Sequence, residues 1–250
     1  MTQGITVEML TYARRMLLLG VVLAAGATCG GEPEAGAGGS DVTRGLLSAA
    51  GETAAAPTGR PSPVRDVPIE ELGFNRGSSE APIRVIEMSD YGCGYCRQFH
   101  LETFPSLREE FIESGIVEWK FVPYVTGMFD NSHAALRASE CTLEQSPQLF
   151  ERVNERLWHE QSAWKGSDDA AGLVRSWADE AGVDLSAFDD CQTNGRRADR
   201  ITAASALARE LGVRGTPTFL VVGYGPLQGA LPLDTFRRIL LSVQEQVTGR

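Results

Sequence analysis

Two cysteines three positions apart constrain this chain more than any other feature. Cys93-Gly94-Tyr95-Cys96 stands where an apolar run at 83–88 gives way to a helical pattern. On the first turn of a helix this spacing brings both sulfur atoms within bridging distance. The unpaired N–H groups and the positive dipole end of a helix N-terminus favour a negative sulfur. We therefore expect Cys93 to be the nucleophilic thiolate and Cys96 to be the thiol that resolves a mixed disulfide.

A structural zinc half-site is the alternative for such a pair. Zinc sites of this kind need a second close pair of ligands. Cys141 and Cys191 stand singly, and the chain's three histidines (His100, His133 and His159) form no zinc-type pair. The pattern favours redox chemistry with no metal and no cofactor beyond the Cys93–Cys96 disulfide itself. The histidines and tryptophans are expected to be core or surface residues rather than catalytic ones.

Glu87 is the one charged residue near the end of the apolar run, six positions before Cys93. Side-chain alternation places it on the same face as Ile83 and Val85. A buried carboxylate there would have a raised pKa and could accept the proton of Cys96. The alternative is that Glu87 reaches solvent at the strand end.

The first 66 residues have the pattern of an export signal followed by a linker, not that of a folded domain. Arg14-Arg15 and a short apolar core predict a signal peptide over residues 1–28, too short to span a bilayer comfortably. Cys29 follows at the position of a lipoprotein cysteine, although Ala25-Gly26-Ala27 could instead be a simple cleavage site. Residues 29–66 are rich in Gly, Ala, Pro, Ser and Thr and are expected to be a flexible linker.

Residues 67–250 are expected to form one α/β domain. The pattern predicts strands at 83–88 and 116–122, a helix at 93–114 kinked by Pro105, and helices through 131–213. Asn131 or Ser132 could cap the first of those helices, and Ile201, Ala204, Leu207 and Leu211 form an apolar stripe on the last. A strand at 218–222, a short partner near 227–231 and a helix from 234, burying Phe236, Ile239, Leu240 and Val243, complete the order.

Net charge and the remaining cysteines narrow the function further. The formal charge of −10 argues against nucleic acid as a partner, because phosphate binding needs a basic face.

Cys141 and Cys191 could form a disulfide worth about 2–4 kcal/mol in oxidising surroundings. Two buried free thiols are the alternative.

The segment from Val85 to Phe99 resembles the active-site region of DsbA-like thiol–disulfide oxidoreductases of the thioredoxin superfamily. Gly212–Phe219 is similar to the cis-proline segment of that family. The resemblance covers roughly residues 68–250. It implies a thioredoxin-like fold with an inserted helical subdomain at about 131–213, and an extra disulfide between Cys141 and Cys191. It also implies a cis bond at Thr216-Pro217, which would leave the Thr216 backbone free to pair with an extended substrate.

The dipeptide between the cysteines departs from many DsbA-like oxidases. Gly94-Tyr95 resembles the dipeptide of disulfide isomerases of the DsbC type, but residues 30–66 cannot supply the folded N-terminal domain that those dimers use. The expected function is a monomeric, exported oxidase of the periplasm or cell envelope, with a lipid anchor where Cys29 is lipidated. Its expected partners are cysteine-containing exported proteins and a membrane oxidase of the DsbB or vitamin-K-epoxide-reductase type. The alternatives are a reductase or isomerase, and a chaperone-like interaction lipoprotein without enzymatic activity.

Overall fold

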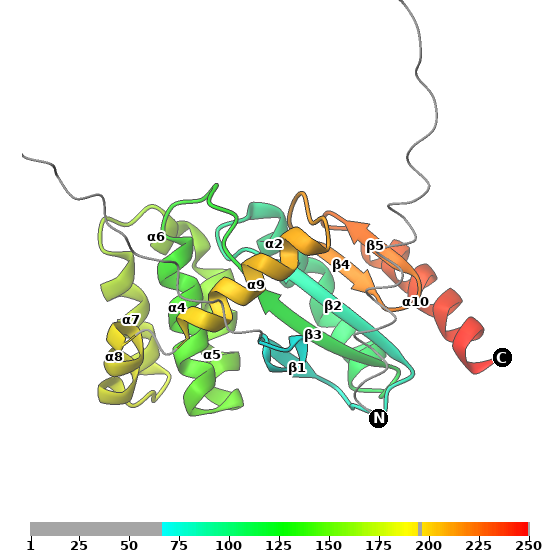
Figure 1. The fold of residues 1–250 in the computed structure, drawn as a ribbon, viewed down its shortest axis with the longest axis horizontal. Helices are drawn as coiled ribbons and strands as arrows, with labels where there is room; N and C mark the ends of the chain where they lie inside the picture. The colour runs from blue at the N-terminus through cyan, green and yellow to red at the C-terminus, as the bar shows by residue number, and fades with distance from the viewer. Residues whose placement is uncertain (1–66, 195–196, 250) are drawn as a thin grey trace, which may run out of the picture. The chain divides into compact units, whose positions relative to one another are not determined.

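The computed structural model of the protein describes residues 67–194 and 197–249. Its described part is built on a mixed five-stranded sheet with the order β1-β3-β2-β4-β5 (Figure 1). The strands are β1 (Phe74–Arg76), β2 (Ile83–Ser89), β3 (Val117–Pro123), β4 (Thr218–Val221) and β5 (Gly225–Gln228). β2 and β3 are parallel, and the other neighbours are antiparallel. The predicted α/β class is confirmed.

β2 is the central strand, and its carboxyl end leads to the cysteine pair. It pairs with β3 on one side and β4 on the other, and only Arg84 along it is less than fully buried. A strand covered on both faces reads as a nearly continuous apolar run, which explains why no alternation is visible in the sequence. Glu87 lies in register between Phe121 and Phe219 and is therefore inside the core.

The predicted helix after Cys93 is present but changes its hydrogen bonding along its length. It comprises α2 (Gly94–Gln98), a π-helical turn η2 (Phe99–Thr103), α3 (Phe104–Leu107) and a second π-helical turn η3 (Arg108–Ile112). In η2 the Phe104 N–H donates to the carbonyl of Phe99, five residues back. Pro105 is the second residue after this turn, and proline in a continuous α-helix would clash with the carbonyl four residues earlier. The wider turn accommodates it.

Helices cover the sheet on both sides. α10 (Leu233–Thr248) contacts β2 and α3, and α9 (Ala198–Glu210) contacts β3 and crosses in front of the sheet in Figure 1. α10 buries three of its four predicted core residues, whereas Ile239 is only partly buried. The predicted stripe on α9 is shifted, because small side chains make its buried face and let the helix lie close to the sheet: Ala203, Ala204 and Ala208.

The remaining helices form a block beside the β1 edge of the sheet (Figure 1). They are α4 (Ser132–Gln145), α5 (Pro147–His159), α6 (Gln161–Lys165), α7 (Ala170–Glu180) and α8 (Leu185–Asn194). Of the two residues predicted to cap α4, Asn131 takes the N-cap position, although its side chain makes no capping hydrogen bond. Its amide instead donates to three carbonyls at the end of α6 and just beyond: Trp164, Lys165 and Ser167.

Strand β1 is absent from the sequence-based prediction. Three residues are too few to show strand periodicity, and the buried residue of this strand is its last one, the charged Arg76, which is 6% exposed. Its guanidinium is buried because it pairs with Glu151 at 2.7 Å and 2.8 Å and lies over the rings of Phe74 and Phe104. β5 also begins two residues before its predicted range.

Candidate active site

Cys93 occupies the N-cap position of α2, and Cys96 lies on the first turn of that helix. Both are unbridged in this structure and buried, Cys96 completely. The intervening Gly94 and Tyr95 are exposed, so the motif presents its dipeptide to solvent and its sulfur atoms inward. A Cβ added to Gly94 would meet nothing within 4 Å.

Thr216 and Pro217 lie against the dithiol although they are far away in sequence. The bond between them is cis. The Cys93 thiol donates a hydrogen bond to the Thr216 carbonyl at 3.3 Å across a separation of 123 residues. The hydroxyl of Thr216 is buried and has no hydrogen-bond partner within the described ranges, which leaves it available to the Cys93 sulfur.

The two thiols have opposite pKa shifts. The pKa of Cys93 is lowered from 9.0 to about 6, above all by the hydrogen bond from Cys96 and, against the effect of burial, by Thr216 and the backbone N–H groups of Tyr95 and Cys96. Burial raises the pKa of Cys96 well above 9.0, and the neighbouring Cys93 raises it further. The backbone N–H groups at the helix N-terminus thus lower the pKa of Cys93, as predicted, but the Cys96 thiol lowers it more.

Glu87 lies beneath the dithiol and is fully buried, which excludes the alternative that it reaches solvent. Its Oε1 accepts a hydrogen bond from Ser89 Oγ at 2.5 Å and lies 2.7 Å from His100 Nε2, and its Oε2 accepts from Trp119 Nε1 at 2.9 Å. Burial alone would raise the pKa of Glu87, but His100, Ser89 and Trp119 together hold it below 4.5. The expectation of a raised pKa is therefore wrong, because it omitted these partners.

Sequence reasoning missed Ser89 and His100. Ser89 follows Glu87 by two positions on β2, so both side chains point to one face. His100 follows Cys96 by four positions on the helical run, which places it on the same side of the helix. This i, i+4 relation was the available signal, but it becomes informative only once Glu87 is known to be buried below that face.

The turn before Cys93 is fixed by polar contacts. Asp90 accepts hydrogen bonds from the Gly92 N–H at 2.9 Å and from the backbone and hydroxyl of Thr126, each at 2.8 Å. The amide of Gln161 donates to the carbonyl of Cys93 at 2.9 Å. A Cβ at Gly92 would lie 2.3 Å from the Ser132 hydroxyl, so only glycine fits there. The N-terminus of α2 is thereby held in place from both the sheet and the helical block.

Comparison with known proteins agrees with this arrangement. A thioredoxin family model matches residues 71–240, more than half of the chain. The chain belongs to the thioredoxin family. The predicted thioredoxin-like fold and the resemblance to DsbA-like proteins are thus confirmed.

Relatives of this thioredoxin-family chain include disulfide bond formation protein D of Bacillus subtilis, 28% identical over 149 residues. That match covers 58% of this chain and 65% of the relative, slightly less than two thirds of its length. A Na(+)/H(+) antiporter of Salinispora tropica is 31% identical over 156 residues, which cover 60% of this chain but 22% of the antiporter.

Two solved structures share the fold. BdbD from Bacillus subtilis in its oxidised form has a TM-score of 0.61 and 23% identity, covering 68% of this chain and 92% of that one. DsbA of Chlamydia trachomatis has a TM-score of 0.62 and 17% identity, covering 70% and 93%. At these identities the likeness concerns the fold alone.

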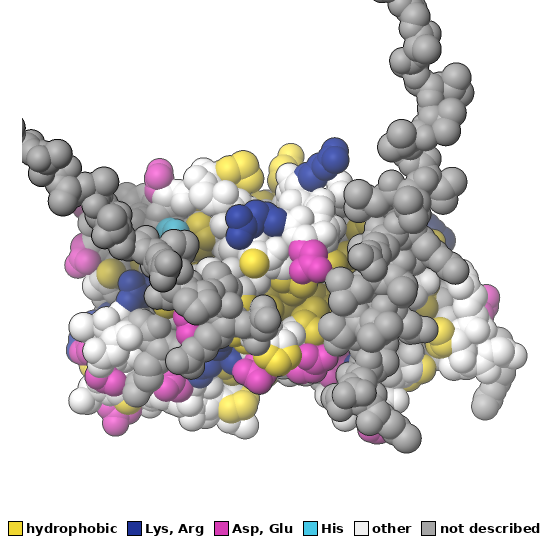
Figure 2. Space-filling view, viewed as in Figure 1, with side chains coloured by type: hydrophobic (Ala, Val, Ile, Leu, Met, Phe, Trp, Pro, Cys, Tyr) yellow, Lys and Arg dark blue, Asp and Glu magenta, His cyan; other side chains and the backbone are white. Residues whose placement is uncertain are grey.

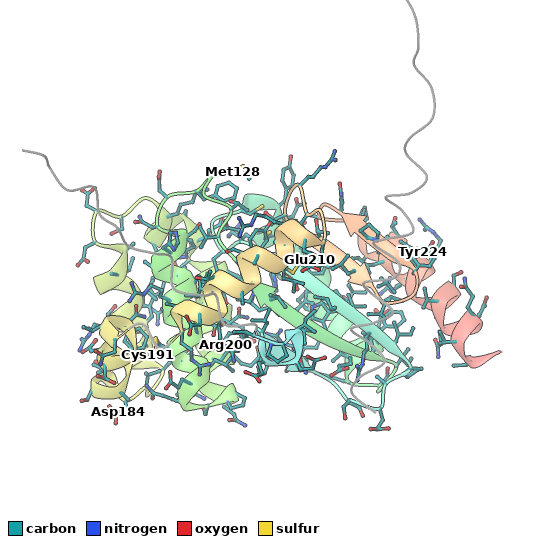
Figure 3. All side chains as sticks on the ribbon, viewed as in Figure 1. Met128, Asp184, Cys191, Arg200, Glu210 and Tyr224 are labelled. Carbon is teal, nitrogen blue, oxygen red and sulfur yellow. A yellow bond between two sulfur atoms is a disulfide. The ribbon has the colours of Figure 1, made fainter. Side chains whose placement is uncertain are left out.

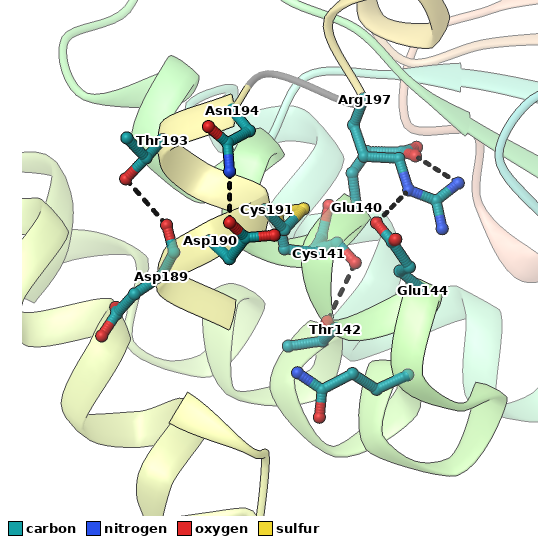
Figure 4. The surroundings of a disulfide bond; sticks show 12 residues. Glu140, Cys141, Thr142, Glu144, Asp189, Asp190, Cys191, Thr193, Asn194 and Arg197 are labelled. Carbon is teal, nitrogen blue, oxygen red and sulfur yellow. Dashed lines mark hydrogen bonds and ion pairs between the residues drawn. A yellow bond between two sulfur atoms is a disulfide. The ribbon is translucent and has the colours of Figure 1, made fainter. Parts of the chain in front are cut away.

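The second cysteine pair of this thioredoxin-family chain lies in the helical block. Cys141 on α4 and Cys191 on α8 form a disulfide with a Cα–Cα distance of 5.8 Å (Figure 4). Both are 2% exposed. The charged side chains around this disulfide pair with one another: Arg197 contacts Glu144 at 3.1 Å and Glu140 at 4.0 Å.

Several predictions concern residues that the structure does not describe. The signal peptide at 1–28, Cys29 and the linker at 29–66 all lie outside the described residues. Across residues 67–194 and 197–249, no helix combines the length and the apolar character needed to cross a membrane. In the same ranges no three His, Cys, Asp or Glu side chains are grouped so that they could hold a metal ion.

Proposed function

We propose that the protein is a thiol–disulfide oxidoreductase that introduces disulfides into cysteine-containing protein substrates. The observation that carries this proposal is the difference between its two thiols. Cys93, with a pKa of about 6, is largely thiolate at neutral pH, whereas Cys96 stays protonated. A low-pKa sulfur is present as the reactive thiolate and is a good leaving group.

The oxidised protein would react in two exchanges. A substrate thiolate attacks the Cys93 sulfur, the Cys93–Cys96 bond breaks, and Cys96 leaves with the electron pair and takes up a proton. A second substrate thiolate then attacks the substrate sulfur of the mixed disulfide. The substrate disulfide forms, and Cys93 leaves as a stabilised thiolate. Two electrons move from the substrate to the protein, one substrate proton is balanced by the proton on Cys96, and the other goes to solvent.

The stabilised thiolate supports the oxidising direction. Any interaction that lowers the pKa of Cys93 favours the reduced protein and makes its disulfide more oxidising. The pKa of about 6 lies between those of thioredoxin, about 7, and DsbA, about 3.5. We therefore expect a reduction potential between about −270 mV for thioredoxin and about −120 mV for DsbA.

The surface beside the dithiol suits an extended protein substrate. Tyr95 and Met128 are large apolar side chains that are 68% and 65% exposed. Apolar side chains are exposed at the upper edge of Figure 2, where Figure 3 labels Met128. The loop that carries Met128 is tied to the turn before Cys93 through Thr126 and Asp90. We assign Thr216 and Pro217 to binding the substrate backbone, and Gly94 and Tyr95 to tuning the exchange.

Glu87 is assigned to proton transfer with Cys96. Its carboxylate is fully buried and has a lowered pKa, so it is ionised at neutral pH and can receive a proton. Ser89 donates a hydrogen bond to Glu87 Oε1 at 2.5 Å, and Ser89 also lowers the pKa of Cys96 against the larger, raising effect of burial. Both observations support an acceptor close to the resolving thiol.

Location and partners follow from the same proposal. An oxidase of this type works outside the reducing cytosol, so we assign the protein to the periplasm or cell envelope, reached through the signal at residues 1–28. Lipidation of Cys29 would anchor it. Its substrates are exported proteins with cysteines, and a membrane oxidase of the DsbB or vitamin-K-epoxide-reductase type returns it to the disulfide form. It acts as a monomer.

Two alternatives lead to different results. A reductase or isomerase is favoured by Gly94-Tyr95, which resembles the DsbC dipeptide, and would be found mostly reduced in cells. A chaperone-like lipoprotein would keep its biological role in a Cys93→Ala variant. Alkylation trapping of the cellular redox state separates the first alternative from the oxidase, and complementation with Cys93→Ala separates the second.

The decisive experiment is equilibration of the Cys93–Cys96 couple with glutathione buffers. A potential nearer −120 mV than −270 mV identifies an oxidant, and one at or below −270 mV identifies a reductant. The Cys96→Ala variant, incubated with a peptide disulfide, should also accumulate a mixed disulfide on Cys93. Absence of any reversible couple would overturn the proposed activity.

A further inference from the structure

A cavity of about 300 Å³ lies where β1, the helical run after Cys93 and α5 meet. Its wall combines polar side chains with apolar ones, and its volume is at the lower end of the range of small-molecule sites. Neither the cysteines of the dithiol nor Thr216 and Pro217 are among the described residues that line it. The cavity is therefore a separate place from the candidate active site.

Three residues of the cavity wall carry hydrogen-bond donors that lack an acceptor. Arg76 Nη1 and Trp158 Nε1 are buried and have no hydrogen-bond partner within residues 67–194 and 197–249. Asn154 Oδ1 accepts from the hydroxyl of Tyr91 at 2.8 Å, so the amide NH₂ is the part of Asn154 that is left as a donor. Buried donors without a partner are destabilising, and a bound acceptor would remove this cost.

Each of these donors is held in place by a neighbour before any ligand arrives. Glu151 accepts from Nε and Nη2 of Arg76 at 2.7 Å and 2.8 Å, which leaves Nη1 as the free end of the guanidinium. The indole of Trp158 is stacked on His100 at 4.3 Å and contacts the ring of Tyr91 at 4.6 Å. A ligand that binds to fixed donors loses less free energy to the ordering of side chains.

The number of donors indicates the chemical group that would fit. Three donors exceed the lone pairs of a single carbonyl oxygen, whereas the two oxygens of a carboxylate can accept all three. Hydrogen bonds to an ionised acceptor are also the stronger ones.

The charges around the cavity favour one negative charge over two. Arg76 and Arg108 each already pair with a carboxylate, Glu151 at 2.7 Å and Glu113 at 3.2 Å. The exposed Glu155 also lines the cavity and would repel a dianion such as phosphate. A monoanion suits this balance.

We propose that this cavity binds a small organic carboxylate. Its oxygens accept hydrogen bonds from Arg76, Asn154 and Trp158, and its apolar part lies against Leu101 and Phe104, which line the same cavity. The site goes beyond the proposed function, because it uses neither thiol and can be occupied while a substrate is bound at the dithiol.

Titration of the full chain with benzoate, followed by ¹⁵N–¹H NMR, tests the site. The chain has four tryptophans and hence four indole N–H signals, and the Trp158 signal is identified by its loss in Trp158→Phe. We expect benzoate to move this signal downfield, with saturation at about 1 mM, and to leave the other three unchanged. Benzylamine, which has a cation in place of the carboxylate, and inorganic phosphate should leave all four in place.

Two variants and a matched control locate the binding through the backbone amide signals. Trp158→Phe should weaken benzoate binding by about 10-fold or more, because one hydrogen bond to a charged group is lost. Asn154→Asp keeps an oxygen for the Tyr91 hydroxyl but replaces the donor by a negative charge, and it should abolish binding. Trp177→Phe is the control, since this tryptophan on α7 does not line the cavity, and it should bind benzoate as wild type does.

The wild-type titration alone can overturn the proposal. No movement of the Trp158 signal at about 20 mM benzoate would show that the donors bind water only. An equal response to benzylamine would show apolar binding without recognition of the carboxylate, and an equal response to phosphate would exclude an organic ligand class. None of these results depends on disulfide exchange, so they leave the proposed function untouched.

Discussion

The sheet region and the helical block each contain a cysteine pair and a buried glutamate with a shifted pKa, yet the state of these residues is opposite in the two regions. Around the sheet, Cys93 and Cys96 are unbridged and Glu87 has a lowered pKa. In the block, Cys141 and Cys191 are joined, and burial raises the pKa of Glu140 despite the nearby cations Arg200 and Arg197. In the proposed function the same residue types serve exchange in one region and stability in the other, and the difference lies in what surrounds them.

Spacing and the neighbouring residues distinguish the two cysteine pairs, since all four cysteines are buried. Cys93 and Cys96 are three positions apart and enclose the exposed Gly94 and Tyr95, whereas Cys141 and Cys191 are 50 positions apart. A long closed loop gives a disulfide a large effect on the unfolded chain. The position of each pair thus determines whether its bond is used or kept.

The largest expected difference between the two pairs comes from replacing Cys93 in one protein and both bridged cysteines in another. Cys93→Ser should abolish disulfide transfer to a reduced two-cysteine peptide, a loss of more than about 1,000-fold, because serine is no substitute for a thiolate. The matched double variant Cys141→Ser/Cys191→Ser should retain transfer at 25 °C within about threefold, since neither residue touches the dithiol. Transfer is measured by mass spectrometry of the peptide. Equal losses in the two proteins would contradict the division of roles.

The opposite pKa shifts of Cys93 and Cys96 should make alkylation selective for Cys93. In the reduced protein, iodoacetamide should modify Cys93 with a half-maximal rate near pH 6, whereas Cys96 stays unmodified at pH 7. Peptide mapping after short exposures measures both sites. In Cys96→Ala the midpoint should rise toward 9.0, because the largest cause of the lowered pKa is lost. A midpoint unchanged by this substitution would assign the shift to the helix N-terminus instead.

The lowered pKa of Cys93 also links stability to pH. A group whose pKa is depressed in the folded state stabilises it above the unfolded-state pKa, and this contribution is lost as pH falls through the folded-state pKa. The free energy of unfolding of the reduced protein, relative to Cys93→Ser, should therefore rise between pH 6 and pH 9. Urea unfolding at each pH measures it, and a constant difference would contradict a stabilised thiolate.

The contribution of the closed pair should appear in stability. Cys141→Ser/Cys191→Ser should lower the free energy of unfolding by about 2–4 kcal/mol, because the bond ties α4 to α8 across 50 residues. Urea unfolding of the oxidised protein measures this, with wild type treated identically as the control. A loss below about 0.5 kcal/mol would show that packing alone holds the block together.

The two buried glutamates should give the smallest effects and opposite pH trends. Glu87 has a lowered pKa, so its contribution is present above 4.5 and is lost as pH falls, and Glu87→Gln should cost about 1–3 kcal/mol at pH 7 but less at pH 4. Glu140 has a raised pKa, so its contribution is lost as pH rises. Glu140→Gln should stay within about 1 kcal/mol of wild type and gain relative stability toward pH 7. If the stabilities of both variants relative to wild type changed with pH in the same direction, the opposite pKa shifts of Glu87 and Glu140 would be contradicted.

Sequence patterns predicted the parts of the fold that depend on local periodicity. The central strand, the helix after Cys93, the helical stretch and the last helix all have long apolar patterns, and they appear close to their predicted positions. Two features were not predicted correctly. β1 has only three residues, which is too short for a visible pattern, and the buried face of α9 consists of alanines rather than large apolar residues. Helical hydrogen bonding near Pro105 also depends on tertiary packing, which periodicity does not encode.

The residues of the candidate site that belong to a sequence motif could be predicted. Cys93-Gly94-Tyr95-Cys96 and Thr216-Pro217 could be picked out, because motif and order are visible in the chain, and the structure brings them together. The electrostatics below them were not predictable. Glu87 meets Trp119 and His100 through β3 and the helical run, and the direction of its pKa shift depends on those long-range partners. A single sequence gives the residue but not its neighbours.

The Cys141–Cys191 bond has a consequence for how the molecule is made. A protein proposed to supply disulfides contains one that links distant parts of its own chain. In the proposed function, each newly synthesised copy needs an oxidant for this bond before it can act on other proteins, and mature copies would supply that oxidant. Production of the active population is then self-reinforcing: the first molecules depend on another oxidant, and later ones on their predecessors.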